Sequence, residues 1–237
     1  MGSTNINKKS KDLIKFWDNA FALDDKTKEE IKKEIKDDDY LSLAPSSKLI
    51  DAASSLVSQS NVLDYGCGTG WASIIMAKKG CKNVTSVDVS PNAISALSFY
   101  SDLFKVSDYI KPIAIDEDWL TRVDDNKYDG IISSNVLDVI PLEISKKIIK
   151  EFARITTKDA KLVIGLNFYL DEEKAKERGM VLTDNELYVD GVLRLLNKKD
   201  EEWIELFSPY FNVLKLDYFA WPNEVKETRR LFILNKK

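Results

Sequence analysis

From about residue 60 to residue 168, short apolar runs alternate with helical patterns in which apolar residues recur every three or four positions. Strand-like runs are NVLDY (61–65), NVTSVDV (83–89), IKPIAI (110–115), YDGIISSNV (128–136) and AKLVIGLNF (160–168). Amphipathic helical stretches lie between them at 71–79, 91–104 and 142–155. This rhythm predicts right-handed βαβ units, and therefore a parallel sheet with helices on both faces.

The pattern changes on either side of this region. Residues up to about Ser10 look polar and loose, and helical patterns follow at 11–22, 24–39 and 45–57. After residue 168 come a charged helical stretch at 171–178, a hairpin signal at Asp190-Gly191, a helix at 199–211 and strands at 212–221 and 229–235. The sequence therefore predicts an α/β, doubly wound, mostly parallel seven-stranded Rossmann-like sheet. We expect a helical extension or cap at 1–45, a main domain at 46–237, and a substrate-side insertion at 169–198.

Composition narrows the chemistry. The chain has no histidine, which excludes Ser-His-Asp triads, HExxH zinc sites and imidazole acid–base catalysis. Its two cysteines, Cys67 and Cys81, have no thiol partners at metal spacing, so we expect reduced thiols and no metal site. A net charge of -4 argues against duplex DNA as a partner. With no apolar stretch long enough for a membrane span and no secretory segment, we expect a cytoplasmic protein.

The stretch VLDYGCGTGWAS (62–73) places three glycines directly after a buried strand. Glycines there let a ligand approach the backbone closely, and the following helix offers its positive amino-terminal end. The spacing Gly66, Gly68, Gly70 does not fit the GxGxxG of dinucleotide binders, and no Gly-Lys-Ser/Thr follows as in a phosphate-binding P-loop. The loop therefore predicts a nucleotide-like ligand other than NAD.

At this loop the sequence resembles the class I S-adenosylmethionine-dependent methyltransferases, whose first motif is an apolar strand, an acidic residue, one further residue and GxGxG. The resemblance covers about residues 60–168. It implies that S-adenosylmethionine is the cofactor and that Asp88, at the end of the second strand, binds the ribose hydroxyls. It also implies an acidic contact with the adenine after the third strand, for which we favour Asp116 and then Glu117, and places Asn135 near the methionine end of the cofactor.

For two residues at the loop, a structural role is as good an interpretation as a contact with the cofactor. Asp64 either contacts the methionine amino group or bonds backbone amides that shape the loop. Trp71 either packs along the ligand or fills the core at the start of a helix. Both count among the cofactor-binding candidates, together with Gly66, Gly68 and Gly70.

Methyl transfer from a sulfonium is an in-line displacement that needs mainly alignment and exclusion of water, so a chain without histidine can perform it. If an acceptor needs a base, Asp138 and Tyr169 are candidates, although an exposed loop carboxylate and a rim tyrosine are the plainer interpretations. Acceptor contacts are expected from Trp17, Tyr40 and Tyr188, whose plainer role is packing. Methyltransferases that act on exocyclic amino groups of DNA bases usually carry Asn/Asp-Pro-Pro-aromatic after the fourth strand. This chain reads NVLD there, which argues against DNA bases as the substrate.

We therefore expect a methyltransferase for a small-molecule acceptor. The alternatives are a methyltransferase acting on protein or RNA, and a regulatory or scaffold protein that binds the cofactor without turnover. The pattern predicts no oligomeric state.

Overall fold

The computed structural model describes residues 2–177 and 179–237. Its centre is a seven-stranded sheet in the order β3-β2-β1-β4-β5-β10-β9. The strands β1 to β5 are mutually parallel, and β10 (Arg229–Lys236) pairs antiparallel with both β5 and β9 (Phe211–Phe219). The predicted α/β, mostly parallel seven-stranded sheet is confirmed.

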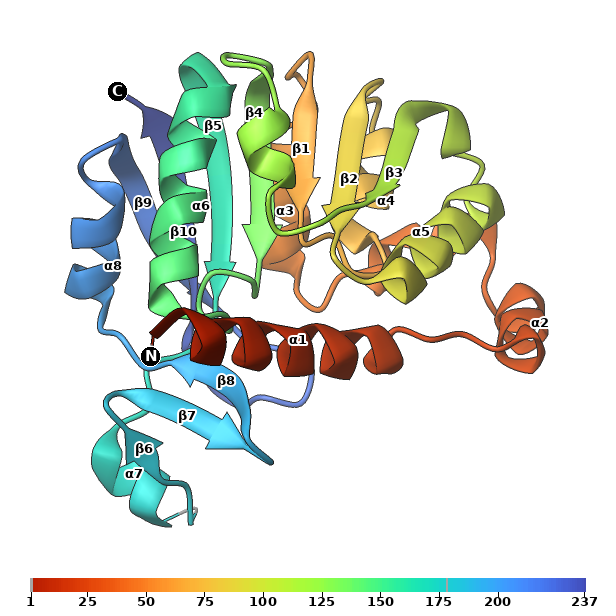
Figure 1. Ribbon diagram of the computed structural model, residues 1–237. Coiled ribbons are helices and arrows are strands. Elements are labelled where there is room, and N and C mark those ends of the chain that lie inside the picture. The colour runs from red at the N-terminus through yellow and green to blue at the C-terminus, as the bar shows by residue number, and fades with distance from the viewer. Residues whose placement is uncertain (1, 178) are drawn as a thin grey trace.

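The alternating half of the sheet follows the pattern of the sequence. Its strands are β1 (Val62–Tyr65), β2 (Val84–Asp88), β3 (Ile110–Ala114), β4 (Tyr128–Ser134) and β5 (Thr156–Leu166). The connecting helices are α4 (Trp71–Lys78), α5 (Pro91–Leu103) and α6 (Leu142–Ile155), with short 3₁₀ helices η2 (Ser107–Tyr109) and η3 (Trp119–Arg122) on either side of β3. Because β1 to β5 run in one direction, their carboxyl ends share one edge, toward which the arrowheads of β1, β2 and β4 point in Figure 1.

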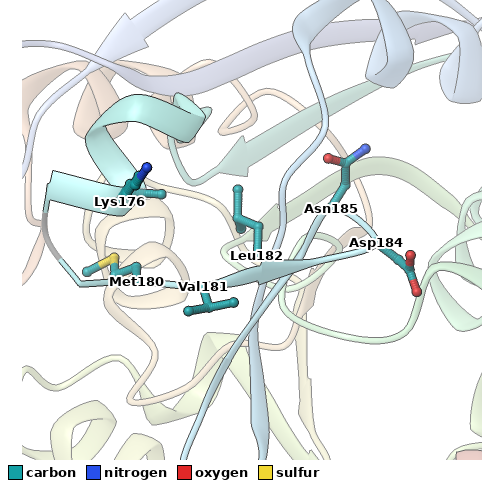
Figure 2. A pocket seen from close by; sticks show the side chains of 7 residues that line it. Lys176, Met180, Val181, Leu182, Asp184 and Asn185 are labelled. Atoms are coloured by element: carbon teal, nitrogen blue, oxygen red, sulfur yellow. The ribbon is translucent and has the colours of Figure 1, made fainter.

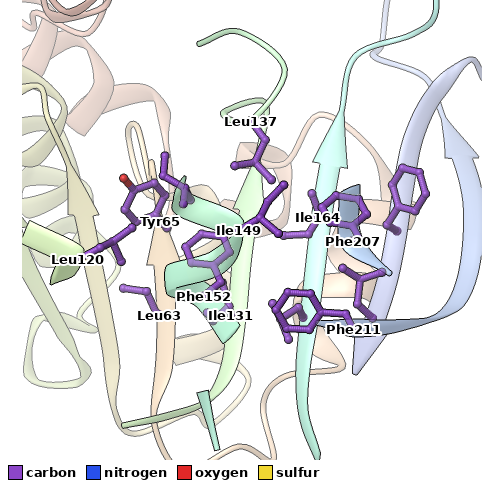
Figure 3. Close-up of a cluster of buried hydrophobic side chains, with 14 of the residues drawn as sticks. Leu63, Tyr65, Leu120, Ile131, Leu137, Ile149, Phe152, Ile164, Phe207 and Phe211 are labelled. Carbon is purple, nitrogen blue, oxygen red and sulfur yellow. The ribbon is translucent and has the colours of Figure 1, made fainter. Parts of the chain in front are cut away.

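Helices cover both faces of the sheet, as the full burial of β1 and β2 requires. One apolar cluster joins the sheet to α3 (Ser47–Ser54), α4 and α5. A second cluster joins the other face to α6, η3 and α8 (Asp200–Phe207), and includes Leu63, Phe152 and Phe207 (Figure 3). Figure 1 shows α6 in front of the sheet and α3 behind it.

An insertion of helix and strands follows β5. It contains α7 (Glu172–Glu177) and a separate antiparallel sheet of β6 (Leu182–Thr183), β7 (Glu186–Val189) and β8 (Val192–Leu196). The Asp190-Gly191 pair has positive φ angles of 52° and 75°, which confirms the predicted tight hairpin. Residue 178, the last of the predicted helix, lies outside the described residues. A shallow cavity of about 470 Å³ lies on this insertion, lined by residues between Ala175 and Asn185 (Figure 2).

The amino-terminal region consists of α1 (Gly2–Ala20), α2 (Asp25–Glu34) and the 3₁₀ helix η1 (Asp37–Leu43). The expectation of a loose segment up to Ser10 was wrong, because α1 begins at Gly2. In Figure 1, α1 runs across the carboxyl edge of the sheet, and it contacts both α5 and β8. Within the described part of the chain, no helix combines the length and the apolarity that a membrane span needs.

Candidate functional site at the carboxyl edge of the sheet

The glycine loop lies between β1 and α4 at the carboxyl edge. Backbone bonds from Gly66 and Cys67 to the carbonyl of Val87 tie it to β2, at 2.8 and 3.0 Å. At Gly70, φ is +85° and an added Cβ would lie 2.0 Å from Cδ1 of Leu97, so only glycine fits. At Gly66, φ is +70° and an added Cβ would lie 2.3 Å from Cγ2 of Val136. Close packing against Val136 and Leu97 therefore requires glycine on both sides of Gly68 in this tight turn.

The amino terminus of α4 opens directly from this loop. Gly70 is its N-cap residue and provides no side-chain hydrogen bond to the first turn. Trp71, the first helical residue, is half-buried and packs beside the apolar cluster on the α3 face. The helix therefore presents its positive end beside the glycine loop without a capping side chain of its own.

Asp88 ends β2 beside the loop and is buried. Its two carboxylate oxygens accept hydrogen bonds from the backbone amides of Gly68, at 3.0 Å, and Ser90, at 2.9 Å. Burial raises the pKa of Asp88, and these backbone bonds partly offset the rise. The carboxylate thus joins the glycine loop to the start of α5, while each oxygen keeps a second lone pair for a ligand.

Asp64 lies in β1 and faces helix α4. It is 4% exposed, and its Oδ2 accepts a 2.6 Å hydrogen bond from the hydroxyl of Ser73, which is 2.6 Å from the hydroxyl of Ser86. Burial raises the pKa of Asp64 to about 7, and the charge of Asp88 adds to the rise. These contacts favour the structural interpretation of Asp64, which links β1, α4 and β2.

The two acidic candidates after β3 differ in their surroundings. Both oxygens of Asp116 lie 2.8 Å from Nη2 of Arg122, an exposed ion pair that lowers the pKa of Asp116. Glu117 is exposed, and its charge contributes to the raised pKa of Tyr65, the last residue of β1, whose main cause is burial. The structure thus pairs the favoured Asp116 with a surface arginine, while the charge of Glu117 acts on Tyr65 at the end of β1.

Asn135 follows β4 with a φ of +58°, a conformation that is uncommon for a residue with a side chain and is enriched at functional sites. The side-chain nitrogen Nδ2 of Asn135 donates a 2.8 Å hydrogen bond to Oδ1 of Asn167, which directly follows β5. The same Oδ1 accepts from Nη1 of Arg229, and the carbonyl of Asn167 accepts from Nε of Arg230 at 2.7 Å. Asn167, just after β5, therefore fixes the orientation of Asn135, and Arg229 and Arg230 in β10 hold Asn167 in turn.

Asp138 belongs to the same polar network. Its side chain is fully buried, and its Oδ2 accepts a 2.5 Å hydrogen bond from the backbone amide of Asn167. Its Oδ1 has no hydrogen-bond partner among the described residues, and burial raises its pKa. The expectation of an exposed loop carboxylate was wrong, because Asp138 is buried and accepts a hydrogen bond from the backbone of Asn167, just after β5.

The remaining candidates lie in different places. Trp17 on α1 stacks on Phe21 at 5.8 Å, and Tyr188 on β7 bonds Glu186 at 2.5 Å. Tyr169 is 38% exposed after β5, under the ammonium of Lys199. Tyr40 in η1 lies under the ammonium of Lys78, the last residue of α4. The structure therefore brings Asp88 to the loop at Gly68 and places Val136, next to Asn135, against Gly66, whereas Tyr40 lies at the far end of α4.

Sequence reasoning missed Asn167, Arg229, Asp18 and Phe21. Asn167 directly follows the fifth strand, and this position was a signal that could have identified it. Asp18 in α1, Phe21 just after α1 and Arg229 in β10 are distant in sequence from the glycine loop, and no local pattern marks them.

A methyltransferase domain model matches residues 38–180, more than half of the chain. The chain belongs to the methyltransferase domain family. This assignment covers the glycine loop, Asp88, Asn135 and the start of the insertion, and it confirms the family resemblance found from the sequence.

Named relatives of this methyltransferase-family chain share parts of it. The ribosomal protein L11 methyltransferase of Campylobacter lari is 34% identical over 143 residues, 58% of this chain and 46% of that protein. A putative protein N5-glutamine methyltransferase of Methanocaldococcus jannaschii is 33% identical over 90 residues, 32% of this chain and 46% of that protein. The chain thus spans less than half the length of these relatives.

A solved structure shares the fold of this family member. It is the 1,6-didemethyltoxoflavin-N1-methyltransferase of Burkholderia thailandensis, solved with 1,6-didemethyltoxoflavin and S-adenosylhomocysteine. Its TM-score is 0.62 at 15% identity, over 81% of this chain and 79% of that one. This likeness supports the fold.

Proposed function

We propose that the chain is an S-adenosylmethionine-dependent methyltransferase that binds its cofactor at the carboxyl edge of β1, β2 and β4. The observation that carries the proposal is the junction of Gly68 and Asp88, where a glycine turn and a buried carboxylate meet beside the uncapped end of α4. The residues fit the group, because the turn is closed to side chains at Gly66 and Gly70 and Asp88 keeps acceptor capacity for ribose hydroxyls.

Each residue of the site has a distinct proposed role. The glycine loop passes beneath the cofactor, Asp88 accepts hydrogen bonds from the ribose, and Asn135 faces the methionine end. Of the two acidic candidates for the adenine, the geometry favours Glu117, since Asp116 is paired with Arg122. Asp64 shapes the loop through Ser73, and Trp71 lines the start of α4.

When bound, S-adenosylmethionine would supply a methyl group on a sulfonium sulfur, and this sulfur would leave as a neutral thioether when the methyl group passes to the acceptor in line. The protein's own contribution is to hold the acceptor in line and to exclude water, an effect worth roughly 7 to 11 kcal/mol. In this structure Asp138 is buried behind Asn167, so its proposed role is to position Asn167 and Asn135. Tyr169, which is exposed, remains the candidate base for an acidic acceptor such as a phenol.

A small molecule is the proposed acceptor. Helix α1 crosses the carboxyl edge between α5 and β8, and the cation–π contact of Arg194 with Phe16, at 3.5 Å, ties it to the insertion. A cavity of about 320 Å³ lies between α1 and the β7–β8 turn, at the small end of the range for small-molecule sites. We propose that residues 1–45 and the insertion at 169–198 enclose the acceptor, with Trp17 and Tyr188 as contacts, and that residues 46–237 form the cofactor-binding domain.

A protein acceptor is the second candidate. The relatives named for ribosomal protein L11 and for protein glutamine favour it, because they match this chain at 33–34% identity. Ribosomal protein L11 is therefore the specific protein to test.

Transfer of label from S-adenosylmethionine carrying a radioactive methyl group distinguishes the candidates. The wild-type protein is incubated with a panel of small amines, thiols, carboxylates and phenols, and in parallel with purified ribosomal protein L11. Asp88→Asn, which keeps the size of the side chain and removes its charge, serves as the matched control. Transfer of label to a small molecule, at a rate that falls in Asp88→Asn, supports the proposal. Transfer of label to ribosomal protein L11 supports the second candidate. Binding of the cofactor without transfer to any acceptor contradicts both.

A further inference from the structure

Phe21, just after the end of α1, lies against the middle glycine of the loop. A Cβ added to Gly68 would be 3.3 Å from Cζ and 3.4 Å from Cε1 of the Phe21 ring. The ring is half-buried and belongs to neither of the two large apolar clusters of the sheet. Apart from its stacking on Trp17, it covers the backbone of the glycine turn rather than filling a hydrophobic core.

A polar anchor holds this part of α1 in place. Oδ1 of Asp18 accepts hydrogen bonds from the hydroxyl of Ser90, at 2.7 Å, and from the backbone amide of Asn92, at 3.0 Å. The side-chain amide of Asn92 donates to the carbonyl and to Oδ2 of Asp18, both at 3.1 Å. A carboxylate at the amino terminus of α5 is also favoured by the helix dipole.

The anchor and the proposed ribose carboxylate act on the same turn. Ser90 donates its backbone amide to Asp88 and its hydroxyl to Asp18, while Asp88 also binds the amide of Gly68. The position of Phe21 over Gly68 is therefore set from α5 by the residues that also hold the glycine loop. An apolar docking of α1 would need neither the buried Ser90 hydroxyl nor the aspartate.

We propose that Phe21 is a cofactor-contacting residue, which forms the outer wall of the cofactor site opposite Gly68, and that Asp18 is the positioning residue that holds it there. This inference rests on the proposed function. The Phe21 ring leaves the loop to admit S-adenosylmethionine and closes on the bound cofactor, so α1 shields the donor from water. Release of cofactor or product then requires the bonds between Asp18 and α5 to open.

The test compares four variants of the full chain by calorimetry and stopped-flow binding with S-adenosylhomocysteine. Phe21→Leu and Asp18→Ala are expected to weaken affinity for S-adenosylhomocysteine about tenfold, mainly through faster dissociation. Phe21→Tyr, which keeps an aromatic ring, is expected to keep the wild-type affinity. Phe16→Leu is the matched control, because Phe16 is in α1 and packs on Arg194 and against Trp17, and not on Gly68. Equal losses in Phe21→Leu and Phe16→Leu would indicate general loosening of α1 and would overturn the proposal.

Hydrogen exchange on the wild-type protein keeps the test independent of how well the variants fold. The backbone amides of residues 16–21 are expected to gain protection when S-adenosylhomocysteine binds. A wild-type protein that binds the ligand without this protection, or a Phe21→Leu variant with wild-type affinity and rates, overturns the inference alone. A folded wild-type protein that does not bind the ligand instead refutes the proposed function.

Discussion

Asp64→Asn removes the charge of the buried carboxylate beneath the glycine loop and leaves the volume of the side chain almost unchanged. Oδ1 of the asparagine still accepts the hydrogen bond from Ser73. The substitution therefore isolates the effect of the charge on folding from the effect of packing.

The magnitude follows from the pKa of Asp64, which burial raises from 3.8 to about 7. This rise corresponds to roughly 4 kcal/mol, at 1.36 kcal/mol for each pKa unit. Because the native state binds the proton more tightly than the unfolded state, the wild-type protein is favoured below pH 3.8 and loses stability as pH rises toward about 7. The asparagine variant lacks this loss, so the free energy of unfolding of the wild type should fall relative to the variant over this window.

Urea unfolding at a series of pH values between 4 and 8 measures this difference, and contributions from other titrating groups cancel between the two proteins. We expect the stability of the wild type minus that of the variant to decrease by several kcal/mol with rising pH. A difference that stays constant would refute the reasoning, since it would mean that Asp64 ionises as it does in the unfolded chain. A tenfold loss of affinity for S-adenosylhomocysteine in the variant would instead favour direct contact with the cofactor.

Four further substitutions test the site. Gly70→Ala should destabilise the fold by at least about 2 kcal/mol in urea unfolding, because of its positive φ and the overlap with Leu97; a loss below 0.5 kcal/mol would contradict the loop geometry. Asp88→Ala should lower both cofactor affinity and stability, the latter by about 1–3 kcal/mol, since two backbone amides lose their acceptor. If calorimetry shows a loss of affinity while the free energy of unfolding stays the same, Asp88 does not stabilise the fold by accepting from these two amides. Glu117→Gln should weaken binding of S-adenosylmethionine several-fold while Asp116→Asn leaves it unchanged, and the reverse order would restore Asp116 as the adenine contact.

The parallel sheet could be predicted from the sequence because each buried strand and each amphipathic helix carries its own local period. Asp88 and Asn135 could be placed for the same reason, since the end of a parallel strand always lies at one edge of the sheet. The tight Asp190-Gly191 hairpin was predictable because this dipeptide adopts positive φ angles readily.

Other features depend on contacts that no local pattern encodes. Asp138 is buried and bonded to Asn167, which follows β5, and the charge of Arg230 in β10 lowers its pKa against the effect of burial. The pairing of Asp116 with Arg122 distinguishes the surroundings of two adjacent carboxylates that look equivalent in the sequence. No local pattern marks Phe21, just after α1, as a neighbour of Gly68, because Asp18 sets this position by fixing α1 to α5.

A crystal structure of the protein with S-adenosylhomocysteine tests the central claim most directly. The account predicts that the ligand lies over Gly68 at the carboxyl edge of the sheet, with its ribose hydroxyls within hydrogen-bond distance of Asp88. A ligand bound elsewhere on the chain, with the junction of Gly68 and Asp88 unchanged, would contradict it.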